Sequence, residues 1–155
     1  MLKPSRPALR VPDWLAPALL VLALLGCSRT PPEERLRAAM SDLQASIEQR
    51  DAKELESYLA LDFVGPDGLD RKGARRMAQV LFLRHRDVGV RTGPEEVALR
   101  SGHATVRFSA ALTGSAGGLL PDSAQVYDVE TGWREEEGTW RLTSVRWTPK
   151  FQPNR

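Results

Sequence analysis

The chain has 155 residues, a length typical of a single domain. It carries 22 Lys and Arg against 20 Asp and Glu, for a formal net charge of +2, and 41% of its residues are hydrophobic, which excludes wholesale disorder. A single cysteine excludes a disulfide framework and a cysteine-based zinc site.

The first 26 residues have the pattern of a secretory signal. Lys3, Arg6 and Arg10 precede an apolar run at residues 14–25, which is shorter than the ~20 residues that a membrane-spanning helix needs. Without residues 1–26 the chain keeps 19 basic and 19 acidic side chains and is neutral. The excess basic charge therefore belongs to the targeting segment, and we expect no nucleic-acid partner.

The end of the apolar run, Leu24-Leu25-Gly26-Cys27, resembles the lipobox of bacterial lipoproteins. The resemblance implies cleavage after Gly26 and acylation of Cys27 with several acyl chains. Several chains would explain stable anchoring, since one chain alone binds a membrane only marginally. The chain would then face the periplasm, and Ser28 after the cysteine favours the outer membrane. A plain signal peptide, or an N-terminal anchor helix with an incidental Cys27, are the alternatives.

The predicted organisation therefore has three parts: a lipoprotein signal peptide at 1–26, the acylated cysteine and a stiff proline-containing tether at 27–32, and one domain at 33–150.

Three helices are predicted first in this domain, at about 32–49, 52–61 and 71–84, because apolar residues recur there at helical spacing. Asp51 and Asp70 are suited to cap the second and third helices. The apolar faces are Leu36, Met40, Leu43 and Ile47; Leu55, Tyr58 and Leu59; and Ala74, Met77, Ala78, Leu81 and Phe82.

After the third helix the apolar period changes from 3.6 to 2, which predicts strands. These strands are expected around 88–90, 97–99, 104–113, 127–133 and 140–147. In the last strand Trp140 and Leu142 have one parity, whereas Val145 and Trp147 have the other. This indicates either a β-bulge near residues 143–144 or a strand with both faces covered.

Helices followed by an antiparallel meander indicate an α+β fold, with three N-terminal helices packed on a curved antiparallel sheet. The chain resembles the nuclear transport factor 2-like superfamily, whose cystatin-like domains form a half-open cone. The resemblance rests on the Gln49-Arg50-Asp51 junction, the Leu61-Asp62-Phe63-Val64 segment and the Gly138-Thr139-Trp140-Arg141-Leu142 ending. The expected core is Leu43, Tyr58, Phe63, Leu81, Phe108, Val129, Trp140 and Leu142.

Isomerase-like members of this superfamily use a carboxylate base and a tyrosine inside the cone. The resemblance places Asp67 near the base position, but Leu43 stands where the tyrosine would belong. Asp67 also precedes a glycine in an ordinary turn dipeptide, so it is expected to be exposed and not catalytic. We therefore expect no catalytic residue.

Aromatic residues gather in the last two predicted strands. A pocket in the cone is predicted to draw on Tyr58, Asp67, Tyr127, Trp133 and Trp147, with core packing as the alternative role for the tryptophans. His85 at a helix end and His103 at a strand start lack the spacing of metal ligands, so no metal and no cofactor are expected. A catalytic His–Asp pair through either histidine, as the resemblance to dehydratase-like members implies, is the alternative to capping for His85 and to a solvated strand end for His103.

Two functional hypotheses follow. The first is a membrane-anchored domain that binds a small apolar ligand or a protein partner without catalysis. The second is a small-molecule isomerase, dehydratase or cyclase of the same superfamily. A homodimer through the open face of the sheet is a further possibility that the resemblance implies, and the Thr/Arg/Ser pattern at 105–109 would make that interface partly polar.

Overall fold

The computed structural model describes residues 30–115 and 123–150, and the described residues from Pro31 onward belong to one compact unit. Cys27 and the signal segment lie outside the described residues. Three α-helices come first: α2 at Pro32–Glu48, α3 at Ala52–Ser57 and α4 at Arg71–Arg84. A short 3-10 turn at Pro66–Gly68 precedes α4.

Local capping explains where two of these helices begin. The carboxylate of Asp51 accepts from the amides of Lys53 and Glu54 at 3.0 and 2.9 Å, and that of Asp70 accepts from the amide of Gly73 at 2.6 Å. Such bonds satisfy amides that have no partner within the helix. The predicted span of α4 is confirmed at both ends.

The second helix is shorter than predicted, because the chain changes to a strand after residue 58. Strand β1 covers Leu59–Val64 and pairs in parallel with β6, so that Leu59 lies opposite Leu142. The apolar residues of this segment fit both periods, and pairing with a distant strand decides between them.

The other strands are β2 (Asp87–Thr92), β3 (Glu96–Arg100), β4 (His103–Ser115), β5 (Ser123–Glu136) and β6 (Thr139–Pro149). The sheet has the order β1-β6-β5-β4-β2, and β3 pairs with the first part of β4 while β2 pairs with its last part. The sheet is therefore mixed rather than wholly antiparallel, since β1 joins it in parallel.

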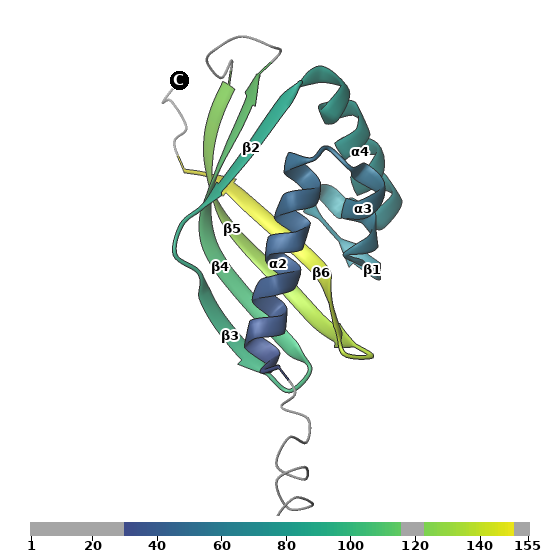
Figure 1. Cartoon of the computed structure of the whole chain (residues 1–155), viewed down its shortest axis with the longest axis vertical. Coiled ribbons are helices and arrows are strands. Elements are labelled where there is room, and N and C mark those ends of the chain that lie inside the picture. Colours follow the sequence, from purple (N-terminus) through teal and green to yellow (C-terminus); the bar gives the residue numbers. More distant parts are fainter. Residues whose placement is uncertain (1–29, 116–122, 151–155) are drawn as a thin grey trace, which may run out of the picture. The chain divides into compact units, whose positions relative to one another are not determined.

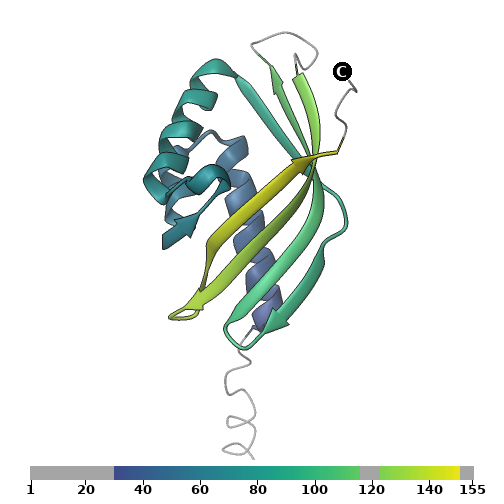
Figure 2. The ribbon, with the colours of Figure 1, turned by 180° about the vertical axis from the view of Figure 1, so that it is seen from behind.

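The helices lie on one side of this curved sheet (Figure 1) and leave its other side uncovered (Figure 2). Helix α2 packs over the sheet against β2 and β6, whereas α4 packs mainly on α3 and β1. The prediction of three helices on the sheet is thus confirmed in part: α2 covers it, and α3 and α4 form a second group beside its β1 edge.

A cluster of buried apolar residues fills the space between α2, β1 and the sheet. Phe63, Trp140 and Leu142 are buried in it as predicted, and Leu43 and Phe108 pack against it while half-buried. Tyr58 and Val129 are also half-buried. The core prediction is wrong for Leu81, which is 41% exposed. Helix α4 buries its alanine face instead, at Ala74 and Ala78.

Of the two alternatives predicted for the last strand, the β-bulge is the one observed. Trp133 lies opposite Leu142, but the preceding Gly132 lies opposite Ser144, so Thr143 is an extra residue in β6. The extra residue reverses the parity of the strand beyond it. Val145 and Trp147 therefore face the helices, as Leu142 does.

Candidate functional site

Strand register divides the sheet into two faces of opposite character. Phe108, Val129 and Trp147 lie opposite one another on β4, β5 and β6, as do Ala110, Tyr127 and Pro149. These positions share the parity of the buried Val106 and Trp133, so they face the helices. The alternate positions on the same strands carry Arg107, Ser109, Asp128, Glu130, Arg146 and Thr148 and face outward.

The helix-facing side is apolar along almost its whole length. Its buried indole, Trp133, donates from Nε1 to Thr131 Oγ1 at 2.9 Å, and the Thr131 hydroxyl donates to the carbonyl of Val106 at 3.2 Å. Among the described residues its one carboxylate is Glu135, at the hairpin end, where Arg35 of α2 binds it at 2.7 Å. The sheet therefore offers mainly apolar contact area on this side, and among the described residues the one buried side-chain nitrogen without a hydrogen-bond partner is Nδ1 of His85, next to Gly114 on β4.

The apolar side is incompletely covered toward one end of the sheet. Leu112 on β4 is 41% exposed and Trp147 on β6 is 40% exposed. Tyr127, between them on β5, is half-buried, and its hydroxyl donates to the side chain of Gln125. Partly exposed aromatic and aliphatic side chains of this kind are suited to contact an apolar ligand.

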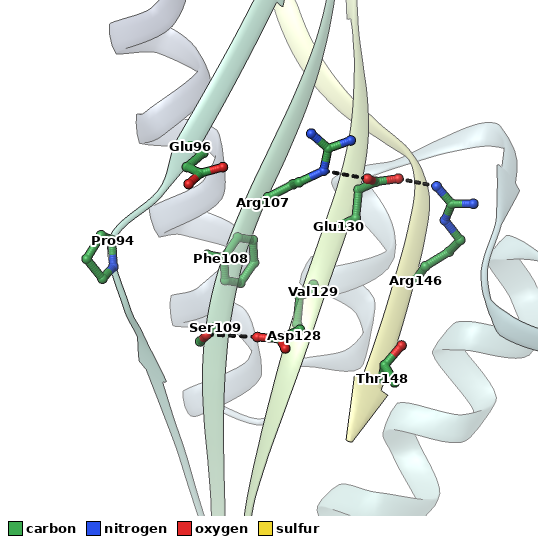
Figure 3. Close-up of a pocket in the computed structure, with 10 residues that line it drawn as sticks. All are labelled: Pro94, Glu96, Arg107, Phe108, Ser109, Asp128, Val129, Glu130, Arg146 and Thr148. Atoms are coloured by element: carbon green, nitrogen blue, oxygen red, sulfur yellow. Dashed lines mark hydrogen bonds and ion pairs between the residues drawn. The ribbon is translucent and has the colours of Figure 1, made fainter. Parts of the chain in front are cut away.

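The outward face holds a shallow hollow of about 640 Å³. It is lined by Pro94, Glu96, Arg107, Phe108, Ser109, Asp128, Val129, Glu130, Arg146 and Thr148. Figure 3 shows Glu130 on the central strand between Arg107 and Arg146, and Ser109 directed at Asp128. The Arg107 guanidinium donates to Glu130 at 2.7 Å, and Arg146 donates to the other oxygen of the same carboxylate.

These contacts set the protonation of the outward carboxylates. The hydrogen bond from Arg146, and then that from Arg107, lowers the pKa of Glu130 below its ordinary value. A hydrogen bond from Ser109, and then one from Lys150, lowers the pKa of Asp128. Both carboxylates are therefore held in the charged form and already have partners, which is unsuitable for a general base near neutral pH.

The five residues predicted to form a pocket do not line this hollow. Trp133 is a core residue, whereas Tyr127 and Trp147 share the helix-facing side of neighbouring strands. Tyr58 ends α3, where its hydroxyl donates to Glu54 at 3.1 Å; burial, and then this bond, raise its pKa. Asp67 is exposed, as predicted.

Asp67 occupies the 3-10 turn with φ of 55°, a left-handed conformation that aspartate tolerates better than most residues. The turn role expected from its sequence is thus the one it has.

The two histidines also lie far from any cluster of ligands. His85 follows α4, and its Nδ1 is buried beside Gly114 with no hydrogen-bond partner among the described residues. His103 begins β4 and is exposed. Within residues 30–115 and 123–150, no three His, Cys, Asp or Glu side chains gather as metal ligands would, and no helix is long and apolar enough to cross a membrane.

The sequence did not predict the line of charged side chains that Arg107, Glu130 and Arg146 form across the outward face. The alternation of polar residues in each strand was visible, but the partners of Arg107 depend on how β4, β5 and β6 align. A search for opposite charges at matching parity in the three strands would have found the line.

No family model and no curated protein matches the sequence. Solved structures do match. The Bdellovibrio bacteriovorus protein Bd1075 superposes with a TM-score of 0.66 at 11% identity, over 74% of this chain and 40% of its own. A candidate dehydratase of the nuclear transport factor 2-like family from Streptomyces avermitilis gives 0.65 at 16% identity, over 77% and 96% of the two chains.

A nuclear transport factor 2-like superfamily protein from Salmonella enterica gives a TM-score of 0.64 at 10% identity, over 79% of this chain and 94% of its own. Structural similarity at such low sequence identity shows a shared fold but does not show a shared activity. The domain therefore has the nuclear transport factor 2-like fold, as the resemblance of its sequence predicted.

Proposed function

We propose that this chain is a lipoprotein of the bacterial cell envelope whose domain binds a small apolar ligand without catalysing a reaction. The division of the sheet into two faces carries the proposal. The helix-facing side presents Tyr127, Leu112 and Trp147 near its incompletely covered end, while Arg107, Asp128, Glu130 and Arg146 of the same strands face outward. Apolar area with one polar tip suits a hydrophobic ligand.

The anchor in this proposal is Cys27, in the outer membrane and facing the periplasm. It is supported by the lipobox-like sequence and by the short distance along the chain from Cys27 to the first residue of α2, Pro32. Mass spectrometry of the mature N-terminal peptide tests it directly. We expect an acylated Cys27, and an unmodified N-terminus at another residue would contradict the anchor.

Binding can be tested with the three tryptophans of the domain as reporters. Trp133 and Trp140 are buried, so a ligand bound at the incompletely covered end of the sheet (the open end, at Leu112, Tyr127 and Trp147) should change mainly the fluorescence of Trp147. We expect the apolar dye N-phenyl-1-naphthylamine to accept energy from Trp147 when bound. Leu112→Glu should weaken dye binding by tenfold or more, because it places a charge in the apolar contact.

Leu61 supplies the matched control. It is an exposed leucine on β1, 85% accessible, on the opposite edge strand of the sheet from β2. Leu61→Glu introduces the same charge and should leave dye binding unchanged. Equal losses in the two variants, or no binding by the unaltered protein, would contradict an apolar site at the open end.

The enzymatic alternative is an isomerase, a dehydratase or a cyclase, and one similar structure is named as a candidate dehydratase. Such chemistry needs an acid or base within reach of the substrate. Asp67 is exposed in its turn, and Leu43 stands at the position of the expected phenol. Asp67→Asn should therefore leave binding unaltered. Turnover of a steroid-like enone that disappears in Asp67→Asn would establish the alternative.

A homodimer through the outward face is a second, separable proposal. The line of Arg107, Glu130 and Arg146 carries both signs of charge, so two copies of the face can be complementary. Sedimentation of the protein at low and high salt tests this. We expect association at low salt that Glu130→Arg abolishes, and a monomer under all conditions would contradict it.

A further inference from the structure

Helix α4 concentrates the positive charge of an otherwise acidic domain. Residues 71–86 contain six Lys and Arg and no Asp or Glu. The other described residues contain 11 basic and 18 acidic side chains. Two of the six cations, Arg71 and Arg75, bind Glu56 from 4.0 and 2.9 Å. Within the described part of the chain, the remaining four form no ion pair: Lys72, Arg76, Arg84 and Arg86.

The same helix exposes apolar side chains among these cations. Lys72, Arg76, Val80 and Leu83 follow one another at helical spacing, so they form one outward stripe. Leu83 is 88% exposed and Val80 is 48% exposed. The opposite side of the helix, with Ala74 and Ala78, is buried. Both views of the domain place α4 at its periphery, beside β1 (Figures 1 and 2).

We propose that the outward stripe of α4 docks on an anionic lipid surface. Long cationic side chains reach lipid phosphates while short apolar side chains enter the boundary of the acyl chains. Cations near an anionic leaflet strengthen binding additively, whereas the acidic remainder of the domain is repelled. The combination of both kinds of side chain in one stripe favours a lipid surface over an acidic protein.

This inference rests on the lipid anchor proposed above, which would keep the domain at a membrane. Four residues lie between Cys27 and Pro32, so the two residues are at most about 18 Å apart when the chain is fully extended. The stripe would then select which side of the domain meets the bilayer. The hairpin between β5 and β6 is a poor competitor for that contact, because Glu135, Glu136 and Glu137 are all acidic.

The orientation can be measured on the full-length protein, purified from membranes and placed in vesicles. Acylation would block the only native thiol, so a fluorophore can be attached at one introduced cysteine. The test position is Leu83→Cys on α4, and the control is Thr148→Cys, an exposed position on the outward sheet face. Lipids that carry a quencher in their acyl chains report contact with the bilayer.

We expect strong quenching at Leu83→Cys in vesicles that contain phosphatidylglycerol, and little in vesicles of phosphatidylcholine alone. The label at Thr148→Cys should stay unquenched in both. Added salt should weaken the quenching, because it screens the attraction. A Leu83→Cys label that is no better quenched than the Thr148→Cys label in anionic vesicles would overturn the proposal. Binding of the α4 stripe to a protein partner, without quenching in anionic vesicles, would overturn it as well.

Charge-reversal variants distinguish the contribution of the α4 stripe to docking from the effect of the protein's net charge. Lys72→Glu with Arg76→Glu should lower the ratio of docked to undocked protein at least about 25-fold, since each lost cation is worth about fivefold. The control pair, Arg91→Glu with Arg100→Glu, changes the net charge equally at exposed positions on β2 and β3. Equal losses in both pairs would overturn the proposal.

The mass of the N-terminal peptide reports the anchor independently of quenching. Unmodified Cys27 would overturn the anchor and would itself take the fluorophore; a label at Leu83→Cys that is quenched in the Cys27→Ser background would then support the docking surface. Acylated Cys27 with an unquenched label would overturn the docking surface and leave the anchor.

Discussion

Replacing Thr131 by valine should leave the buried indole N–H of Trp133 without a hydrogen-bond acceptor. The hydroxyl of Thr131 accepts from Trp133 Nε1 at 2.9 Å and donates to the carbonyl of Val106 at 3.2 Å. All three residues are buried. Valine has nearly the shape of threonine, so the substitution removes these hydrogen bonds while it keeps the packing.

The cost follows from the group that loses its partner. A buried N–H without an acceptor costs about 1–3 kcal/mol, and the added methyl group returns about 0.8 kcal/mol. The free energy of unfolding should therefore fall by about 1.2 kcal/mol, within a range of about 0.2–2.2 kcal/mol. With a slope of about 2 kcal/mol per molar urea, the unfolding midpoint of Thr131→Val should fall by about 0.6 M.

A double-mutant cycle with Trp133→Phe isolates the hydrogen bond. Phenylalanine has no N–H, so Trp133→Phe should cost less in the Thr131→Val background than in the unaltered protein, by about 1 kcal/mol. Urea unfolding followed by circular dichroism gives all four free energies. An unchanged midpoint for Thr131→Val, or a coupling energy of zero, would refute the assigned bond.

Three further predictions address the outward face, the core and the anchor. Arg146→Gln should raise the pKa of Glu130 toward its ordinary value; because this pKa is lowered in the folded state, the contribution to stability exists above the unfolded pKa and is lost as the pH falls through the folded one. A carboxyl titration by NMR that shows no change would contradict this. Phe108→Ala should lower the free energy of unfolding by about 2 kcal/mol, less than for a fully buried ring, since Phe108 is half-buried. A loss below about 0.5 kcal/mol, the value typical of surface substitutions, would mean that its ring does not pack. Cys27→Ala should leave an unprocessed, lipid-free precursor on mass spectrometry, and normal processing would exclude the lipoprotein pathway.

Local chemistry explains the elements that were predicted well. Asp70 and the change of apolar period bound α4 at both ends, because capping and periodicity act within one turn of helix. The error at Leu81 has a different cause. The apolar face of a helix indicates which residues are able to be buried, but the elements packed against the helix decide how much of that face is covered. Helix α4 packs on α3 and β1 and buries its alanines.

The candidate site was predicted less completely than the fold. Tyr127 and Trp147 share the helix-facing side of neighbouring strands, whereas Trp133 lies in the core, Tyr58 ends α3 and Asp67 lies within the 3-10 turn. Membership of one site depends on contacts between segments far apart in sequence. The charged partners of Glu130 come from β4 and β6, and no local pattern specifies that alignment.

By itself the sequence determined the span of α4, most of the strands, which residues alternate between the two sides of each strand, and a change of parity near Thr143 in β6. Those features arise from interactions within a few residues. Only the tertiary structure decided that β1 pairs with β6 in parallel, that the change of parity is a bulge, and that Trp147 therefore shares a side with Leu142. Pairing joins distant segments, and a one-residue shift moves every later side chain to the opposite face of the sheet.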